Sequence, residues 1–229
     1  MPKGLSGNQL KVIAMVTMTI DHIGDILFPQ LLWLRLIGRL ALPVYAFLIA
    51  EGCRHTRSMG RYLGSVALMA LLCQATVALC GSWYQSILVT FSMSIGLIFL
   101  LQKLQETKKP LWSNLFAVAV AGVFFVTEML PGLLSGTDYA VDYGFLGVML
   151  PVVVWLMPKK LWQLMTAAVV LLLMGLSAWS QLLALGAVPL LALYNGQRGK
   201  YNLKWLFYWY YPVHLAIIHL IGMLWGAYL

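Results

Sequence analysis

The positive charges of this chain are distributed as in a membrane protein of fixed orientation. Thirteen of its fifteen Lys and Arg residues lie in short segments between long hydrophobic runs, and the other two, Arg35 and Arg39, lie inside one such run. Hydrophobic residues make up 62% of the 229 residues and charged residues 10%, which is more apolar side chain than a soluble domain can bury. The bilayer is therefore the expected solvent. The net charge of +8 indicates membrane topology and no nucleic-acid partner.

The hydrophobic runs predict an all-α integral membrane protein with a single domain over residues 1–229. A spanning helix needs roughly 20 residues, and about nine spans are expected, at 11–28, 31–50, 62–80, 86–102, 112–130, 143–157, 161–177, 180–194 and 205–226. Basic segments alternate with uncharged or acidic ones along the chain. Because Lys and Arg favour the cytoplasmic side, we expect a cytoplasmic N-terminus and an external C-terminus.

The segment 161–194 is short for two crossings. Its 34 residues leave spans of about 15–17 residues, below the usual length of a lipid-facing helix, and Pro189 interrupts the second. A thinned bilayer, tilted helices inside the bundle and a re-entrant hairpin all remain open. The alternation of basic loops favours two passes, because Lys160 and Arg198 must lie on the same side.

Three helices that are distant in sequence place polar side chains at a common depth. At about 1.5 Å per residue from the nearest loop, His22, Arg39 and His214 each lie about 15–16 Å deep. In a hydrocarbon core of about 30 Å, all three are near the midplane. Ionisable residues at this depth are costly and usually face the bundle interior at a functional site.

Carboxylates and guanidiniums are matched on the first two helices. Asp21 and Asp25 are four residues apart and share a face with His22, and Arg35 and Arg39 repeat the same spacing on the next helix. A short loop makes the two helices antiparallel neighbours, so the charges can balance in low dielectric. The cluster could simply lock the helices together. Two histidines at the same depth favour a functional site, because the imidazole exchanges a proton near neutral pH.

A basic surface is expected where the second helix reaches the cytoplasm. Arg54, Arg57 and Arg61 follow an i, i+3, i+7 spacing that would form one helical face able to hold phosphates, and Lys103 would add to it. Topology and lipid headgroups explain each residue equally well on its own. On the external side, Asp138 and Asp142 would favour a cationic acceptor.

Several segments in order along the chain resemble the TraX family. They are residues 10–11 (LK), 18–24 (MTIDHIG), 33–43 (WLRLIGRLALP), 47–52 (FLIAEG), 54–57 (RHTR), 142–148 (DYGFLGV), 194–199 (YNGQRG) and 211–215 (YPVHL). The founding TraX protein acetylates the N-terminus of a conjugative pilin. The first two helices are also similar, more distantly, to those of transmembrane acyltransferases.

The resemblance implies a membrane acetyltransferase in the bacterial cytoplasmic membrane. Acetyl-CoA would be the co-substrate, no metal is expected, and the acceptor would be a protein N-terminus, a glycan or a lipid-linked molecule. The partners are then acetyl-CoA, this acceptor, the bilayer and, as an option, a second copy of the chain.

Each polar position then receives an expected role. His22 would be the general base or would itself be transiently acylated, Asp21 or Asp25 would fix its tautomer, and Arg39 or His214 would stabilise the thioester oxyanion. The residues expected to bind acetyl-CoA are Glu51, Arg54, Arg57, Arg61, Lys103, Asn195 and Arg198. Those expected on the acceptor side are Arg35, Asp142, Tyr143 and His219.

A proton-coupled transporter or a lipid flippase is the rival interpretation. The same cluster of Asp, His and Arg at mid-depth would serve as a proton relay. The sequence shows no internal inverted repeat of the kind common in transporters, and nine spans do not divide into halves. The enzyme therefore remains the leading hypothesis.

Overall fold

A computed structural model describes residues 4–79, 81–201 and 203–225, and it is built from helices, as predicted. In chain order the elements are α1 (Gly7–Ile26), α2 (Leu32–Gly38), α3 (Ala41–His55), α4 (Met59–Leu79), α5 (Ile87–Thr107), α6 (Pro110–Phe124), the π-helix η1 (Phe125–Met129), α7 (Leu130–Leu133), α8 (Gly144–Leu156), α9 (Lys160–Ser177), the 3-10 helix η2 (Trp179–Gly186), α10 (Ala187–Ala192) and α11 (Lys204–Leu224). Each expected span falls on one helix or on consecutive helical pieces. Residues 80 and 226, which end two of them, lie outside the described part of the chain.

Within the described residues, five helical stretches are long and apolar enough to cross a membrane, so the chain is a multi-pass membrane protein. They are Leu32–His55, Met59–Leu79, Ile87–Thr107, Pro110–Leu133 and Lys160–Ser177. Helix α1 has 20 residues, but Lys11, Asp21 and Asp25 make it less apolar. The helices in 144–156, 179–192 and 209–224 are apolar but shorter. Nine crossings and the orientation stay predictions.

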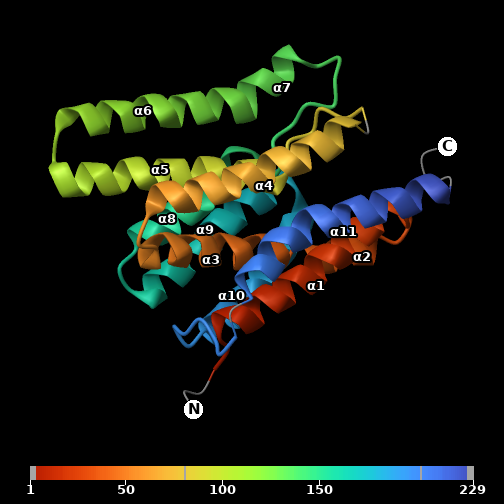
Figure 1. The fold of residues 1–229 in the computed structure, drawn as a ribbon, viewed down its shortest axis with the longest axis horizontal. Helices are drawn as coiled ribbons and strands as arrows, with labels where there is room; N and C mark the ends of the chain where they lie inside the picture. Colours follow the sequence, from red (N-terminus) through yellow and green to blue (C-terminus); the bar gives the residue numbers. More distant parts are fainter. Residues whose placement is uncertain (1–3, 80, 202, 226–229) are drawn as a thin grey trace. The chain divides into compact units, whose positions relative to one another are not determined.

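Contacts divide the chain into two compact units, Met1–Leu48 with Met157–Leu229, and Ile49–Leu156. We call these unit 1 and unit 2. In unit 1, α1 packs against α2 and α11 (Figure 1). A β-carbon on Gly38 would lie within about 2.5 Å of the Asp21 carboxyl carbon, so glycine is required there for α2 to approach this carboxylate. That residues 1–229 form a single functional domain stays a prediction.

The second expected span is interrupted between α2 and α3, at Arg39 and Leu40. Pro43 has no N–H to donate to the carbonyl of Arg39, and its ring would clash with that carbonyl in a regular helix. The interruption therefore follows from the proline four residues later, and it places Arg39 at a break in the backbone.

The hairpin of α9, η2 and α10 has two legs of similar length. Eight residues of 3-10 helix at about 2.0 Å per residue and six of α-helix at about 1.5 Å give the return leg about 25 Å, against about 27 Å for the 18 residues of α9. Lys160, at the start of α9, donates to the carbonyl oxygens of Ala192 and Tyr194, both 2.6 Å from Nζ. The hairpin thus returns to its starting level, because 3-10 geometry lengthens a segment that is short as α-helix.

The start of α1 is held by a distant loop. Ser6 and Gln9 form a capping box, and the N–H groups of Gly7 and Asn8 donate to the carbonyl oxygens of Gln197 and Arg198 at 2.7 and 2.9 Å. These bonds satisfy N–H groups that a helix N-terminus leaves without partners.

In unit 2, α5 packs against α4, α6 and α8, and α5 and α6 form a hairpin (Figure 1). The buried Ser94 hydroxyl donates to the Val148 carbonyl at 2.7 Å and ties α5 to α8. Helix α6 widens into the π-helix η1 just before Pro131, where a regular helix would need an N–H that proline lacks.

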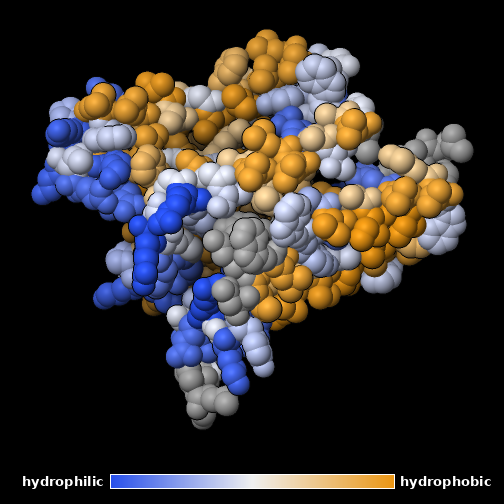
Figure 2. All heavy atoms as spheres, viewed as in Figure 1, coloured by the Kyte–Doolittle hydropathy of each residue, from blue (hydrophilic) through white to orange (hydrophobic). Residues whose placement is uncertain are grey.

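Large apolar side chains are exposed on both units. Figure 2 shows hydrophobic residues over α6 and along α11, and hydrophilic ones at the turn between α5 and α6. In the most apolar 18-residue stretch of Pro110–Leu133, only 6% of the residues are buried inside the structure. Such surface is stable when lipid covers it.

Candidate functional site

Two histidines from opposite ends of the chain meet in unit 1. Nδ1 of His22, on α1, lies 2.9 Å from Nε2 of His214, on α11. The ring centroids are 5.0 Å apart, and His214 is 7% exposed. The sequence placed these residues at one depth, and the structure brings them into contact.

Aromatic side chains of α11 enclose the pair. The ring of Tyr210 stacks on His214 with centroids 4.9 Å apart and planes at 15°. The ring of Tyr211 is nearly perpendicular to both imidazoles, with its centroid 6.1 Å from that of His22 and 5.4 Å from that of His214. The other nitrogen of His214, Nδ1, lies 2.8 Å from the carbonyl oxygen of Tyr210.

Tyr210 is itself anchored to α1. Its hydroxyl lies 2.5 Å from the hydroxyl of Thr19, which bonds to the Met15 carbonyl oxygen at 2.9 Å. Sequence reasoning missed Thr19, Tyr210 and Tyr211. The helical spacing could have indicated them. These residues precede the two histidines by three or four positions and therefore lie on the same helix faces.

The carboxylates of α1 pair with α2. Nη1 of Arg35 lies 2.6 Å from Oδ1 of Asp25, and its Nε lies 3.7 Å from Oδ1 of Asp21. Of the two arginines expected opposite these aspartates, Arg35 contacts both carboxylates. Asp21 also interacts electrostatically with Arg39, and Asp25 with His219.

The expected partner of His22 is wrong at its Nδ1 atom. We expected Asp21 or Asp25 to hold this ring, but Nδ1 has His214 as its partner while both carboxylates contact Arg35. Guanidinium attracts carboxylate more strongly than a neutral imidazole does. Helix α1 is rotated so that its two aspartates face α2, and His22 therefore faces α11.

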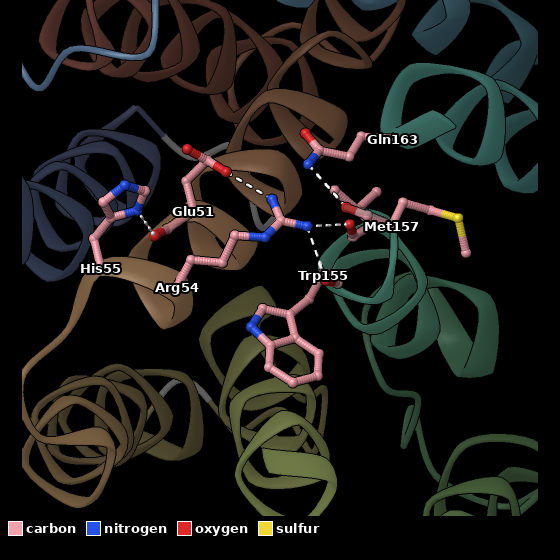
Figure 3. Close-up of polar contacts among 7 residues, drawn as sticks. Glu51, Arg54, His55, Trp155, Met157 and Gln163 are labelled. Atoms are coloured by element: carbon pink, nitrogen blue, oxygen red, sulfur yellow. Dashed lines mark hydrogen bonds and ion pairs between the residues drawn. The ribbon is translucent and has the colours of Figure 1, made fainter. Parts of the chain in front are cut away.

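Arg54 is bound at the end of another helix in unit 2 (Figure 3). Its Nη1 lies 2.6 Å from Oε1 of Glu51, and its Nη2 donates to the carbonyl oxygens of Val154 and Trp155 at 2.6 and 2.8 Å. Both carbonyls belong to the last turn of α8, where a helix leaves its acceptors without partners. Arg54 thus caps α8 with a positive charge.

A continuous basic face over Arg54, Arg57 and Arg61 is therefore a wrong expectation. Helix α3 ends at His55 and α4 begins at Met59, so the i, i+3, i+7 spacing does not run along one helix. Arg57 and Arg61 are exposed, whereas the side chain of Arg54 is 21% exposed and holds α8.

Loss of the Arg54 cap should destabilise unit 2. Arg54→Ala is expected to lower the free energy of unfolding by about 2–3 kcal/mol, because two carbonyls and Glu51 lose a charged donor. Thermal unfolding in detergent measures the change. Arg57→Ala is the matched control, with an expected change within about 0.5 kcal/mol for an exposed residue. Equal effects of the two substitutions would contradict the capping role.

The other expected acetyl-CoA ligands belong to different elements of the two units. Lys103 pairs with Glu106 at 2.8 Å on the exposed end of α5. In unit 1, Asn195 and Arg198 belong to the loop that holds the start of α1. Asn195 accepts from the N–H of Gln197 at 2.9 Å and bonds with its backbone N–H to Leu5.

The acidic residues of the loop before α8 are bonded to the loop before α5. Asp138 accepts from the Ser82 hydroxyl at 2.5 Å and from the Trp83 N–H at 2.8 Å, and these donors lower its pKa below the usual value. Asp142 accepts from the Tyr84 hydroxyl at 2.6 Å. Tyr143 follows with a φ of 60°, a conformation that is rare for a bulky residue.

Among the described residues, no group of three or more His, Cys, Asp or Glu side chains is placed to hold a metal ion. Unit 1 brings together the imidazole pair, its neighbouring tyrosines and the Asp–Arg cluster. Proton transfer and charge stabilisation are what these groups do.

Comparison with known proteins places the chain in a family. The family model described as TraX protein matches residues 6–222. A probable fimbrial assembly protein, FimC, of Dichelobacter nodosus is 26% identical, and the match covers 93% of this chain and 94% of the relative. An uncharacterised protein of Rickettsia prowazekii (strain Madrid E) is 55% identical over 38 residues, which are 17% of this chain and 15% of that protein. No solved structure shows a significant match. Because the family model covers nearly the whole chain, this multi-pass membrane protein belongs to the TraX family.

Proposed function

We propose that this protein is an acetyltransferase that moves an acetyl group from cytoplasmic acetyl-CoA to an amine or hydroxyl acceptor at or across the bacterial cytoplasmic membrane. The observation that carries the proposal is the 2.9 Å contact between His22 and His214. An imidazole pair inside an apolar protein supplies a base whose proton can be shared. Family membership supports acetyl transfer as the reaction.

The transfer requires one proton to leave the acceptor and one to reach the sulfur. His22 removes the proton as the acceptor nitrogen or oxygen attacks the thioester carbonyl carbon, and the carbonyl electron pair moves onto oxygen. Arg39 is the candidate group to stabilise this oxyanion. When the carbonyl re-forms, the carbon–sulfur bond breaks and His22 returns the proton to the CoA thiolate.

The two substrates would meet the chain at opposite faces of the membrane, with nine spans and a cytoplasmic N-terminus. Arg57, Arg61, Lys103 and Arg198 would serve the phosphates of acetyl-CoA. Arg54 and Asn195 would act by holding backbone groups, and Glu51 by holding Arg54. The acceptor side comprises Arg35, Asp142, Tyr143 and His219. A pilin-type N-terminus is the favoured acceptor, since the FimC relative is named as a fimbrial assembly protein.

Purified protein in lipid nanodiscs tests the proposal. With acetyl-labelled acetyl-CoA and a synthetic apolar peptide bearing a free α-amine, we expect labelled peptide and one free thiol per transfer. The same peptide with a formylated N-terminus is the control for amine acceptors. Absence of acetyl-CoA binding together with absence of label on either peptide, on lipid or on the protein would refute acetyl transfer.

A proton-coupled transporter is favoured by one observation, the charged cluster beside the imidazole pair in unit 1. Its signature would be proton flux in liposomes that requires a substrate gradient and no CoA. Proton flux without any acetyl transfer would support the transporter and contradict the enzyme.

A further inference from the structure

The hydrogen-bond partners of the histidine pair determine where the protons lie. The Tyr210 carbonyl oxygen, 2.8 Å from Nδ1 of His214, is only an acceptor, so this nitrogen carries a proton. A neutral His214 then has a lone pair on Nε2. The proton in its 2.9 Å contact with His22 must therefore sit on Nδ1 of His22. Nε2 of His22 is left without a proton and is the basic atom.

The same logic orients the groups behind His214. The Thr19 hydroxyl donates to the Met15 carbonyl oxygen, so in its 2.5 Å contact with Tyr210 the phenol is the donor. Tyr210 is thereby anchored to α1 at its hydroxyl, while its ring stacks on His214 and its carbonyl oxygen accepts a hydrogen bond from Nδ1 of His214. One residue holds the imidazole by two contacts.

We propose that His214 is a positioning residue for the reaction above, and that it keeps His22 in the tautomer with Nδ1 protonated and Nε2 basic. This inference rests on the proposed function only for the role of Nε2 in acetyl transfer. A proton taken up at Nε2 makes His22 a cation, whose Nδ1 proton is shared with His214. The Tyr210 ring, stacked on His214 with centroids 4.9 Å apart, holds the imidazole that shares this proton.

Nitrogen-15 NMR of histidine-labelled protein in nanodiscs reads the tautomer directly, with or without activity. The chain has four histidines, and in the double variant His55→Gln/His219→Gln only His22 and His214 remain. We expect a proton on Nδ1 and a bare Nε2 for both rings, with scalar coupling between Nδ1 of His22 and Nε2 of His214. A proton on Nε2 of His22, or no coupling between the rings, overturns the proposal.

Substitutions at 214 separate positioning from packing. His214→Gln places an amide oxygen where it can accept from Nδ1 of His22, whereas His214→Leu fills space without an acceptor. A wrong tautomer of a catalytic histidine lowers kcat by about 10⁴-fold in the serine-protease triad. We expect His214→Leu to lower kcat by about 10²–10⁴-fold, His214→Gln to retain most of it, and KM for acetyl-CoA to stay unchanged in both.

Equal losses of kcat in folded His214→Gln and His214→Leu protein would overturn positioning through the tautomer. Tyr210→Phe, which keeps the stacked ring and the carbonyl but loses the Thr19 bond, is the milder control and should cost less than about tenfold. If the protein transfers no acetyl group, the NMR result still decides the tautomer. Failure of the proposed function and failure of this inference are thus separate outcomes.

Discussion

Replacing His22 with alanine is expected to lower kcat for acetyl transfer by about 10²–10⁴-fold, the usual cost of losing a general base. Affinity for acetyl-CoA should stay close to that of the unaltered protein, because His22 is expected at mid-depth, away from the phosphates. Single-turnover rates with labelled acetyl-CoA give the first quantity, and calorimetric titration with CoA gives the second. A transiently acylated His22 would make the loss larger.

The exposed His55 provides the matched control for this experiment. Its Nδ1 contacts the carbonyl oxygen of Glu51 at 3.0 Å within its own helix, so His55→Ala removes a histidine outside the pair and should leave kcat within about threefold. Near-normal turnover of His22→Ala would rule out His22 as the base. Loss of CoA binding along with turnover would indicate a damaged fold instead, which a shift in monodispersity would reveal.

The second large effect concerns stability. Arg35→Ala should lower the free energy of unfolding by about 2–3 kcal/mol, because the partly buried Asp21 carboxylate loses a charged donor. The side chains of Arg35 and Asp21 are 28% and 15% exposed, so the Asp21 carboxylate would lose one of its two cations, with Arg39 remaining, at a site that water reaches poorly. Unfolding in mixed micelles, followed by circular dichroism, measures the loss.

An exposed pair on α5 shows how burial sets this magnitude. Lys103 and Glu106 are 2.8 Å apart with side chains that are 36% and 45% exposed, whereas those of Arg35 and Asp21 are 28% and 15% exposed. Lys103→Ala should cost less than about 1 kcal/mol, since water solvates both charges. If both substitutions cost the same, the α1–α2 pair is solvated and does not lock the helices.

Much of the helical architecture and one ion pair were predictable from local pattern. Apolar runs bounded by basic loops marked each helical segment, because a helix in lipid must satisfy its backbone within its own residues. The i, i+4 spacings of Asp21 with Asp25 and of Arg35 with Arg39 predicted opposed charges on neighbouring helices, and the structure pairs both aspartates with Arg35. Even the interruption at Arg39 follows from Pro43.

Side-chain partners were settled only by the packing of helices that are far apart in sequence. The depth of His22 and His214 follows from residue counting, but whether Nδ1 of His22 meets an aspartate or an imidazole depends on the rotation of α1 between α2 and α11. Arg54 looked like a phosphate ligand because its role depends on the end of α8, one hundred residues later. The hairpin over 160–194 needed 3-10 geometry to return to its starting level. Hydrogen bonding inside a helix is local and can be read from a sequence, whereas the contacts between helices depend on rotation and close packing that only the folded chain establishes.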